Sequence, residues 1–369
     1  MTMTHEDIKD LVQGTINTLP PVKFTQLSQK YRDYHIYPTM FKGSGADMDV
    51  ETRSGTEIEF DALVKNSQTA RNTGLYEPDT TSVVDGLKKG KVPWAYTQAS
   101  YFFEDREVSM NSGKRQLLNL IKTRREQCML NLADILEENF FGAPEGPTDV
   151  KTPRGLFYWL VKSSATTSAT SNCGFNGGHP SGFNDVGGLS VSDHPAWKNY
   201  VAPYYSVKPW DNSGTTVLGD LAPKLRRALK YTNWKSPLGG EEMGKNFGLN
   251  YKLFTNVETE SQIEEMLEDK NDLMFKSDLT PLYGKTTFKG HPFYSVGILD
   301  GDSTNPIYGV NTSTFKMIFL SDFKMRESTV RDAPNQHLVS IVFVDNGYNW
   351  VCVNRRLNFV LSKVSTYAA

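Results

Sequence analysis

The stretch from residue 112 to residue 141 constrains the fold of this chain more than any other feature. Its apolar residues recur at spacings of three and four, which indicates one buried helical face: Leu117, Leu118, Ile121, Cys128, Leu132, Ile135 and Leu136. Ser112 can cap the start of such a helix, and Gly142 followed by Pro144 ends it. At ~1.5 Å per residue, the predicted helix is roughly 45 Å long.

The charges on this helix oppose its dipole. Basic residues come early and acidic residues come late: Lys114, Arg115, Lys122, Arg124 and Arg125, then Asp134, Glu137 and Glu138. A helix dipole prefers the reverse order by ~0.3–1 kcal/mol per charge. Either these charges have partners outside the helix, or they are solvated charges that tolerate a small penalty.

The preceding residues, 55–110, have the pattern of a long β-hairpin. Apolar and acidic residues alternate from residue 56 to residue 64, and the return strand, expected over Trp94–Val108, is rich in aromatic residues. Between them lies a long polar tip, residues 66–91. An isolated two-stranded hairpin is marginally stable in water, so this one needs a surface to lie on. That surface belongs either to a neighbouring subunit or to the chain's own core.

Three acidic residues, Glu57, Glu59 and Asp61, share one face of the first strand. Such a row could be a site that uses paired carboxylates. A solvated face, or one paired with lysines, is the interpretation we favour, because like charges on a rigid strand repel one another.

The remainder of the chain mixes short helices and strands in blocks, without a regular βαβ alternation. Residues 1–54 are poor in apolar clusters and predict an extended arm with a short helix near Glu6–Val12, and residues 163–192 predict a loop. Two further helices are expected, from an N-cap at Asp220 to Tyr231 and over Ser261–Phe275, the latter after a capping box of Thr259 and Gln262. Strands are expected over Lys252–Asn256, Leu338–Val344, Tyr348–Val353 and Leu357–Leu361, with a turn at Asp345-Asn346-Gly347. This pattern predicts an α+β fold.

Charge and cysteine content exclude several classes of protein. The 40 basic and 42 acidic residues leave a net charge of −2, so the chain lacks the basic excess of a protein that wraps nucleic acid. Its three cysteines, Cys128, Cys173 and Cys352, lie far apart, which argues against a disulfide framework or a zinc site. No apolar run has the length of a signal peptide or of a membrane span.

No motif in the sequence points to catalysis, to a metal or to a cofactor. Gly284-Lys285-Thr286 resembles the end of a phosphate-binding loop, but position 279, where the motif needs glycine, is Leu279; a turn between strands is the simpler interpretation. The histidines are scattered, and no nucleophile elbow or paired-histidine metal motif occurs. Two basic clusters stand out and are expected on the exposed surface: Lys88, Lys89 and Lys91, and Lys224, Arg226, Arg227 and Lys230.

Three stretches resemble the major capsid proteins of tailed bacteriophages, which share the Hong Kong 97-type fold. The first is the hairpin followed by the long helix, residues 56–141. The second is Val186-Gly187-Gly188-Leu189 followed by His194-Pro195-Ala196-Trp197-Lys198-Asn199, and the third is Asn354-Arg355-Arg356-Leu357-Asn358-Phe359-Val360-Leu361. The order of elements is similar over nearly the whole chain.

The resemblance implies a division of the chain into the parts of a capsid subunit. Residues 1–54 would be the N-terminal arm and residues 55–110 the extended hairpin, called the E-loop. Residues 111–215 would form the peripheral domain with the spine helix 112–141, and residues 335–369 would return to it. Residues 216–334 would form the axial domain.

The resemblance also implies which residues make contacts. At the E-loop tip we expect contacts with a neighbouring subunit through Arg71, Tyr76, Lys88, Lys89, Lys91 and Trp94. The spine helix would be carried by Leu118, Ile121, Arg125, Leu132 and Ile135. Some relatives join subunits by an isopeptide bond between an E-loop lysine and an asparagine, and Asn354 or Asn358 could accept Lys88, Lys89 or Lys91 here.

The implied function is structural. Copies of the chain, as hexamers and pentamers, would close into an icosahedral shell around double-stranded DNA, with only weak, non-specific DNA contact, no cofactor and no membrane. Further partners would be the portal and a separate scaffolding or decoration protein; assembly would take place in the bacterial host cytoplasm, and residues 1–54 would escape maturation cleavage. The alternatives are an encapsulin-type nanocompartment shell, and a hydrolase or sugar-binding protein whose groove is lined by Trp94, Tyr96, Tyr101 and Phe103.

Overall fold

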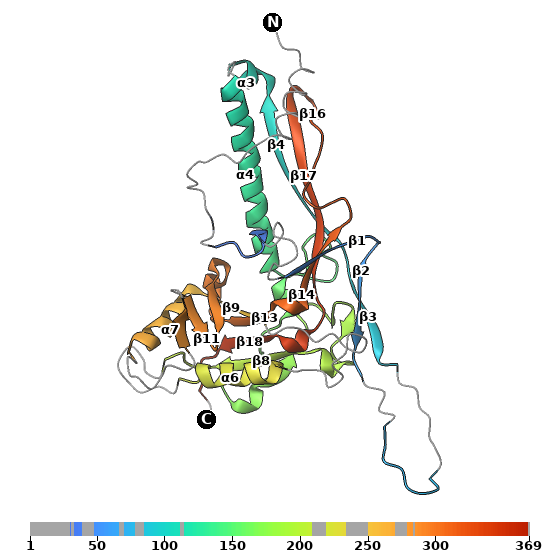
Figure 1. Cartoon of the computed structure of the whole chain (residues 1–369), viewed down its shortest axis with the longest axis vertical. Helices are drawn as coiled ribbons and strands as arrows, with labels where there is room; N and C mark the ends of the chain where they lie inside the picture. Colours follow the sequence, from blue (N-terminus) through green and yellow to red (C-terminus); the bar gives the residue numbers. More distant parts are fainter. Residues whose placement is uncertain are drawn as a thin grey trace.

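A computed structural model describes most of the chain. The described residues are 30, 33–38, 48–65, 70–77, 85–110, 114–208, 219–233, 250–269, 279–282 and 285–367. The helix expected at Glu6–Val12 lies outside these residues. A long helix and two long strands form one end of the molecule, a second sheet with two helices forms the other, and a hairpin projects from the side (Figure 1).

The long helix is α4 (Lys114–Phe140), and it confirms the prediction from the apolar spacing. Its 27 residues span about 40 Å. It packs along β4, whose partner is the 17-residue strand β17. These belong to a six-stranded sheet made of β1 (Asp49–Arg53), β4 (Ala95–Glu104), β14 (Phe315–Leu320), β15 (Arg326–Glu327), β16 (Arg331–Ala333) and β17 (Gln336–Cys352).

The turn predicted at Asp345-Asn346-Gly347 is wrong, because β17 runs straight through it. In register, β4 pairs Thr97 with Asn346 and Tyr96 with Gly347. On the loop before β15, the Met325 N–H donates to Asn346 Oδ1 at 2.7 Å. The hydrogen-bond partners on β4 and on the loop before β15 outweigh the local turn propensity of this segment. The two predicted strands therefore form one strand that is about 55 Å long.

The hairpin exists, but its return strand is not the predicted one. Strand β2 (Ile58–Leu63) pairs with β3 (Leu87–Val92), a segment predicted to belong to the tip. The aromatic segment predicted to return, Trp94–Val108, instead supplies β4 and the short helix α3 (Asp105–Met110). Pro93 separates β3 from β4, since proline cannot donate to a ladder.

The second sheet has eight strands. Their spatial order is β10 (Leu279–Leu282), β11 (Lys285–Phe288), β12 (His291–Ser295), β9 (Tyr251–Thr255), β13 (Ile307–Asn311), β18 (Phe359–Lys363), β8 (Asn199–Tyr204) and β5 (Gly174–Gly177). Helix α6 (Leu221–Thr232) packs on β8 and β18, and α7 (Val257–Asp269) packs on β11 and β12. Strands β10 and β11 pair antiparallel with Leu282 opposite Lys285, which agrees with a turn between strands at the broken phosphate-loop motif, whose Gly284 lies outside the described residues.

Short elements connect these layers. The segment 163–192, predicted as a loop, also contains β5 and the two-residue strands β6 (Asp185–Val186) and β7 (Leu189–Ser190). The remaining short helices are α5 (Leu156–Trp159), η1 (Thr170–Asn172), η2 (Pro195–Trp197), η4 (Gly297–Gly301), η5 (Thr312–Thr314) and η6 (Arg355–Leu357).

Helix α6 begins where predicted but lacks the predicted side-chain cap, and helix α7 begins earlier than predicted. Asp220 precedes α6 as expected, but its carboxylate accepts from the Tyr205 and Ser206 N–H groups at 2.8 and 3.2 Å and does not cap the helix. Helix α7 begins four residues before the predicted Ser261, and Asn256 caps it by accepting from the Thr259 N–H at 3.0 Å. The predicted capping box is therefore wrong, because a better cap occurs earlier in the chain.

The sheets cross the boundaries expected between domains. Strand β18, from the range 335–369 expected to return to the peripheral domain, pairs with β13 of the expected axial range in the eight-stranded sheet. Strand β14, from the expected axial range 216–334, pairs with β17 in the six-stranded sheet. Each sheet therefore combines strands from distant parts of the sequence.

Candidate assembly surfaces

The outer face of the hairpin is a ladder of opposite charges. Lys89 Nζ lies 3.2 Å from a Glu59 carboxylate oxygen, and Lys91 Nζ lies 3.4 Å from Glu57 and 3.5 Å from Glu59. Hydrogen bonding from Lys89 lowers the pKa of Glu59, and hydrogen bonding to Glu57 raises the pKa of Lys91. The prediction of a lysine-paired carboxylate face is confirmed. Lys88 pairs with Asp85 at 2.5 Å, so these lysines lie on the body of the hairpin and not at its tip.

The tip carries strongly exposed apolar residues. Segment 70–77 lies at the far end of the hairpin, away from both sheets (Figure 1). Leu75 and Tyr76 are 88% and 97% exposed, and Tyr76 has a left-handed backbone with φ 63°. Arg71 lies 3.7 Å from Glu77, whose carboxylate also accepts from the Gly74 N–H at 2.8 Å. Local polar contacts thus shape a tip whose apolar side chains contact little of their own subunit.

A second exposed apolar pair lies where the described hairpin strands end. Leu63 on β2 is directly opposite Leu87 on β3, and the two are 70% and 58% exposed. Leucines are rarely left so open on both strands of a hairpin unless another surface covers them. Sequence reasoning missed this pair, because Leu87 had been placed inside a polar tip.

The opposite face of the hairpin is fixed to the body by Phe60. Its ring stacks on Trp197 with centroids 5.9 Å apart and meets Trp159 edge-on at 6.0 Å. Gly90, directly across on β3, has no side chain to displace the ring, and a Cβ there would lie 2.2 Å from Phe60 Cζ. The base of the hairpin therefore has a fixed orientation relative to the core.

The Gly187-Gly188 turn makes the second contact with the base of the hairpin. Both glycines have positive φ, 62° and 75°, in the tight turn between β6 and β7. The Lys91 N–H donates to the Gly187 carbonyl at 2.8 Å, and a Cβ on Gly187 would lie 2.8 Å from the Trp159 ring. A glycine at position 187 is thus needed both for the turn and for the close approach of the Trp159 ring.

The structure brings the resembling motifs together around Arg355. Trp197 Nε1 donates to the Val186 carbonyl at 3.0 Å, which links the two halves of the second motif. Arg355, fully buried, donates to the carbonyls of Trp159, Trp197 and Gly178 at 2.7, 2.7 and 2.8 Å, and to Asn199 Oδ1 at 3.1 Å. Burial lowers the pKa of Arg355 to about 10, so it stays charged near neutral pH and ties the C-terminal motif to the second one, whose Trp197 ring also stacks on Phe60 of the first.

Trp94 does not lie at the hairpin tip, contrary to the prediction. It follows β3 at the base, is 7% exposed, and donates from Nε1 to the Gly55 carbonyl at 2.9 Å. Tyr101 and Phe103 are also buried, whereas Tyr96 is 62% exposed on the other face of β4. These aromatic residues do not share one groove, which removes the basis for the hydrolase or sugar-binding alternative.

On the spine helix, the apolar stripe is largely buried as expected. Ile121 and Leu132 are 1% and 0% exposed, but Ile135 is 38% exposed and lies outside the stripe. The side chain of Leu118 lies outside the described residues. Arg125 bonds Glu327 on β15 at 2.6 Å, and Arg124 bonds Glu107 on α3 at 2.8 Å. Two of the early basic charges of the helix, Arg124 and Arg125, therefore have partners outside it, within the same chain.

Part of the N-terminal arm is held on the spine helix by a buried carboxylate. Glu137, 1% exposed, accepts from the backbone N–H groups of His35 and Ile36 at 3.1 and 3.0 Å. Tyr34 donates to Asp134 at 2.6 Å, and Lys30 pairs with Glu138. Burial raises the pKa of Glu137 to about 7, although the two N–H groups oppose this shift. The sequence left open whether Glu137 has a partner outside the helix, and the structure supplies one in the arm.

The two asparagines considered for a cross-link differ in access. Asn358 is fully buried, its Oδ1 accepts from the Asn311 N–H at 2.7 Å, and its Nδ2 donates to Thr314 at 3.0 Å. It cannot reach a neighbouring subunit without breaking these bonds, so it is not a suitable cross-link partner. Asn354 is half-buried and accepts from the Arg356 N–H at 3.1 Å.

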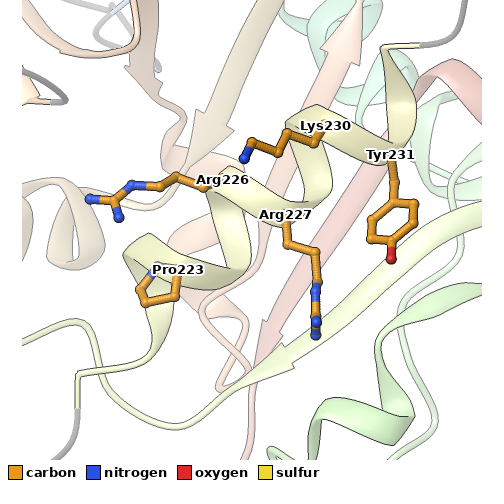
Figure 2. A pocket seen from close by; sticks show the side chains of 5 residues that line it. All are labelled: Pro223, Arg226, Arg227, Lys230 and Tyr231. Atoms are coloured by element: carbon orange, nitrogen blue, oxygen red, sulfur yellow. The ribbon is translucent and has the colours of Figure 1, made fainter.

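The basic cluster on α6 is only partly exposed. Lys224, predicted on the surface, is 7% exposed; its Nζ donates to the carbonyls of Ser168 and Pro203 and lies 2.7 Å from Asp220. Pro223, Arg226, Arg227, Lys230 and Tyr231 line a groove of about 370 Å³ on the outer side of the helix. In Figure 2, Arg226 and Lys230 extend to one side of α6, and Arg227 and Tyr231 extend to the other.

The described residues contain no assembled chemical centre. Among them, no three histidine, cysteine or acidic side chains gather as metal ligands would. None of the described helices has both the length and the hydropathy needed to cross a membrane. The three cysteines are free thiols, and burial raises the pKa of Cys128 to about 11.

Comparison with known proteins supplies the fold. No protein-family model and no curated protein matches the chain. Its structure is similar to the capsid asymmetric unit of cyanophage A-1(L), with a TM-score of 0.57 and 12% identity over 94% of this chain and 97% of that one. It is also similar to the capsid of a native GTA particle (TM-score 0.54, 10% identity, 94% and 96% covered) and to a chain of Mycobacterium phage Bobi (0.50, 8%, 98% and 99%). The chain therefore has the α+β fold of phage capsid proteins, the Hong Kong 97-type fold that its sequence resembles.

Proposed function

We propose that this chain is the major capsid protein of a tailed bacteriophage, and that its copies close into an icosahedral shell around double-stranded DNA. The observation that carries the proposal is the extent of the shared fold, which includes 94% of this chain and 97% of the cyanophage capsid chain. The projecting hairpin supports it, because the hairpin exposes apolar residues that a neighbouring copy would cover.

In the assembled shell the hairpin is the E-loop. Its base is fixed by Phe60 and the Gly187 turn, so the tip is presented in one direction. Leu75 and Tyr76 at the tip, together with Leu63 and Leu87, supply the apolar contact. Arg71 adds charge at the tip, Lys89 and Lys91 add charge along the body of the hairpin, and Lys91 and Asn354 stay available as a cross-linking pair.

The expected parts of the subunit keep their roles in this proposal. Residues 1–54 form the arm, held in part by Glu137 on the spine helix. The eight-stranded sheet with α6 and α7 carries the axial contacts at the centres of pentamers and hexamers, and the six-stranded sheet with α4 carries the peripheral ones. A portal and a separate scaffolding or decoration protein complete the particle.

The role of the chain is structural and not enzymatic. With a net charge of −2 the subunit would contact the packaged DNA weakly and without sequence preference. Its location is the capsid of the virion, after assembly in the cytoplasm of the bacterial host.

Electron microscopy of the purified full-length chain tests this proposal. Closed icosahedral particles tens of nanometres wide, formed by the protein alone or with a co-expressed scaffold, are the expected result. A monodisperse monomer under both conditions would overturn it. Shells that retain a specific co-purifying enzyme instead of DNA would identify a nanocompartment.

A further inference from the structure

We infer that the basic outer side of α6 in one subunit binds the acidic outer side of α7 in the next subunit around a ring. This inference rests on the proposed function and names one contact that holds the capsomer together. The partner surface is a second copy of this chain, and the contact is head to tail.

The first observation is the opposite charge of the two helices. Between Leu221 and Thr232, α6 has four basic residues and no acidic one. Between Val257 and Asp269, α7 has six acidic residues and no basic one. The exposed side chains are Arg226, Arg227 and Lys230 on α6, and Glu258, Glu264 and Glu265 on α7. The near-zero net charge of the chain therefore hides two strongly charged surfaces.

The second observation is where these helices lie on the sheet. Their apolar sides enter one core, with Leu225 of α6 and Ile263 of α7 among its members, so both helices cover the same face. Helix α6 lies over β18 and β8, and α7 lies over β11 and β12, with β9 and β13 between them (Figure 1). The two helices are four strand spacings apart. At ~4.8 Å per spacing their axes are about 19 Å apart, roughly twice the axis-to-axis distance of helices that pack against each other.

The third observation is that one exposed charge of each helix is turned toward a different edge of the sheet, whereas Arg226 and Lys230 extend to the other side of α6. Tyr231 stacks on Tyr200 of β8 with centroids 5.7 Å apart, so the side of α6 that carries Tyr231 and Arg227 is turned toward the β5 edge. On the other helix, Glu264 accepts from the Thr286 hydroxyl of β11 at 3.1 Å, which turns it toward the β10 edge.

Four of these six charges are not used in ion pairs with other described residues. Within the described part of the chain, Arg227, Lys230, Glu258 and Glu264 form no ion pair, whereas Glu265 pairs with Lys208. A heterologous contact joins one surface of a copy to a different surface of the next, and such contacts close into rings. The cationic outer side of α6 and the acidic outer side of α7 are two such different surfaces, and their unlike charges also fix which surfaces meet.

A packaged polyanion is the other ligand that the cationic groove could attract. The unlike-charged surface of the same chain favours the second copy, because a site for DNA gains nothing from the carboxylates on α7. The two occupants are separable, since only one of them depends on α7.

Matched charge reversals test the inference in the full chain. One variant carries Arg227→Glu and Lys230→Glu, a second carries Glu258→Lys and Glu264→Lys, and a third carries all four changes. All four positions are exposed, so the thermal melting of each variant should stay close to that of the unaltered chain. We expect each double variant to lose assembly by about tenfold or more, and the four-fold variant to regain it, because its contacts are again between unlike charges.

A mixture of the two double variants sharpens the test. Each variant alone has like charges at every contact, but strict alternation of the two restores unlike charges throughout. Alternation can close an even-numbered ring and cannot close an odd-numbered one. The mixture should therefore form hexamers and extended sheets or tubes, and few closed shells.

The outcomes separate the inference from the proposed function. If the unaltered chain assembles and the double variants assemble equally well, the contact does not exist. If the α6 variant forms normal shells that lose DNA, the groove binds the polyanion and the inference is overturned. If the unaltered chain never assembles, the proposed function itself fails, and the inference fails with it.

Discussion

The ring of Phe60 on β2 covers the backbone of Gly90, its direct partner on β3, so closely that a Cβ at position 90 would lie 2.2 Å from Phe60 Cζ. This one contact joins the two strands of the hairpin to the Trp159 and Trp197 rings of the core. The hairpin is thus free at its tip and fixed at its base. A shell subunit needs both properties, because the tip must reach a neighbour in a defined direction.

Gly90→Ala should loosen the base of the hairpin. The added methyl group must displace the Phe60 ring from its stack, and overpacking of this kind costs about 1–3 kcal/mol. Thermal melting of the unassembled chain measures the loss. Gly146→Ala is the matched control, since nothing lies within 4 Å of a Cβ at that position. Equal melting of the two variants would show that the ring is not held where we place it.

Replacement of residues 66–84 by an Asn-Gly turn should leave the subunit folded and unable to form shells. Removal of the whole predicted tip, residues 66–91, would destroy β3, which begins at Leu87. The Val64 N–H donates to the Gly86 carbonyl at 2.8 Å, so a two-residue turn can close the hairpin after Lys65. Circular dichroism checks the fold, and electron microscopy counts the shells. Shells of normal stability would refute a role for the tip in assembly.

Leu132→Asp should prevent folding, and Ile135→Asp should not. Leu132 is fully buried on α4, where an unpaired carboxylate costs several kcal/mol, whereas Ile135 is 38% exposed on the same helix. The measurement is the yield of soluble protein with a cooperative melting transition. Both variants have the same chemistry and nearly the same helical context, so burial alone separates them. A cooperative melt of the Leu132 variant would contradict our placement of the core.

The attachment of the arm to the spine helix should weaken as pH rises from 5 to 8. The pKa of Glu137 is raised by burial, from about 4.5 in the unfolded chain to about 7 when the arm is bound. The folded state therefore binds the proton more tightly, and the stability from this group is present at low pH and lost as pH passes 7. Between pH 5 and pH 8, this difference in pKa lowers the free energy of unfolding by about 2–3 kcal/mol.

Chemical denaturation of the unassembled chain at several pH values measures this term. The variant Glu137→Gln cannot titrate at this position, so its free energy of unfolding should depend less on pH over the same window. If both proteins show the same dependence, then Glu137 does not control the arm in this range.

The sequence by itself determined the elements whose partners are local. The apolar residues of α4 recur at helical spacing, and this predicted both ends of the helix within two residues. The pattern is clear because a helix that buries a single face repeats its apolar residues with the period of the helix. Alternation on β2 predicted which side of the hairpin is charged, and three short motifs indicated the capsid resemblance. What the resemblance implied for the fold is confirmed by the structural comparison.

Only the tertiary structure decided the pairings between distant segments. Asp345-Asn346-Gly347 has the local preference of a turn, yet β4 supplies ladder partners that keep it extended. Leu87–Val92 has the composition of a polar loop, yet Phe60 and the Gly187 turn make it a strand. Lys224 was expected on the surface, and the sequence did not decide whether Glu137 is solvated or paired; each is buried with backbone partners. Local propensity amounts to about 1 kcal/mol per residue, so contacts from far along the chain outweigh it wherever they bury a side chain or satisfy a backbone group.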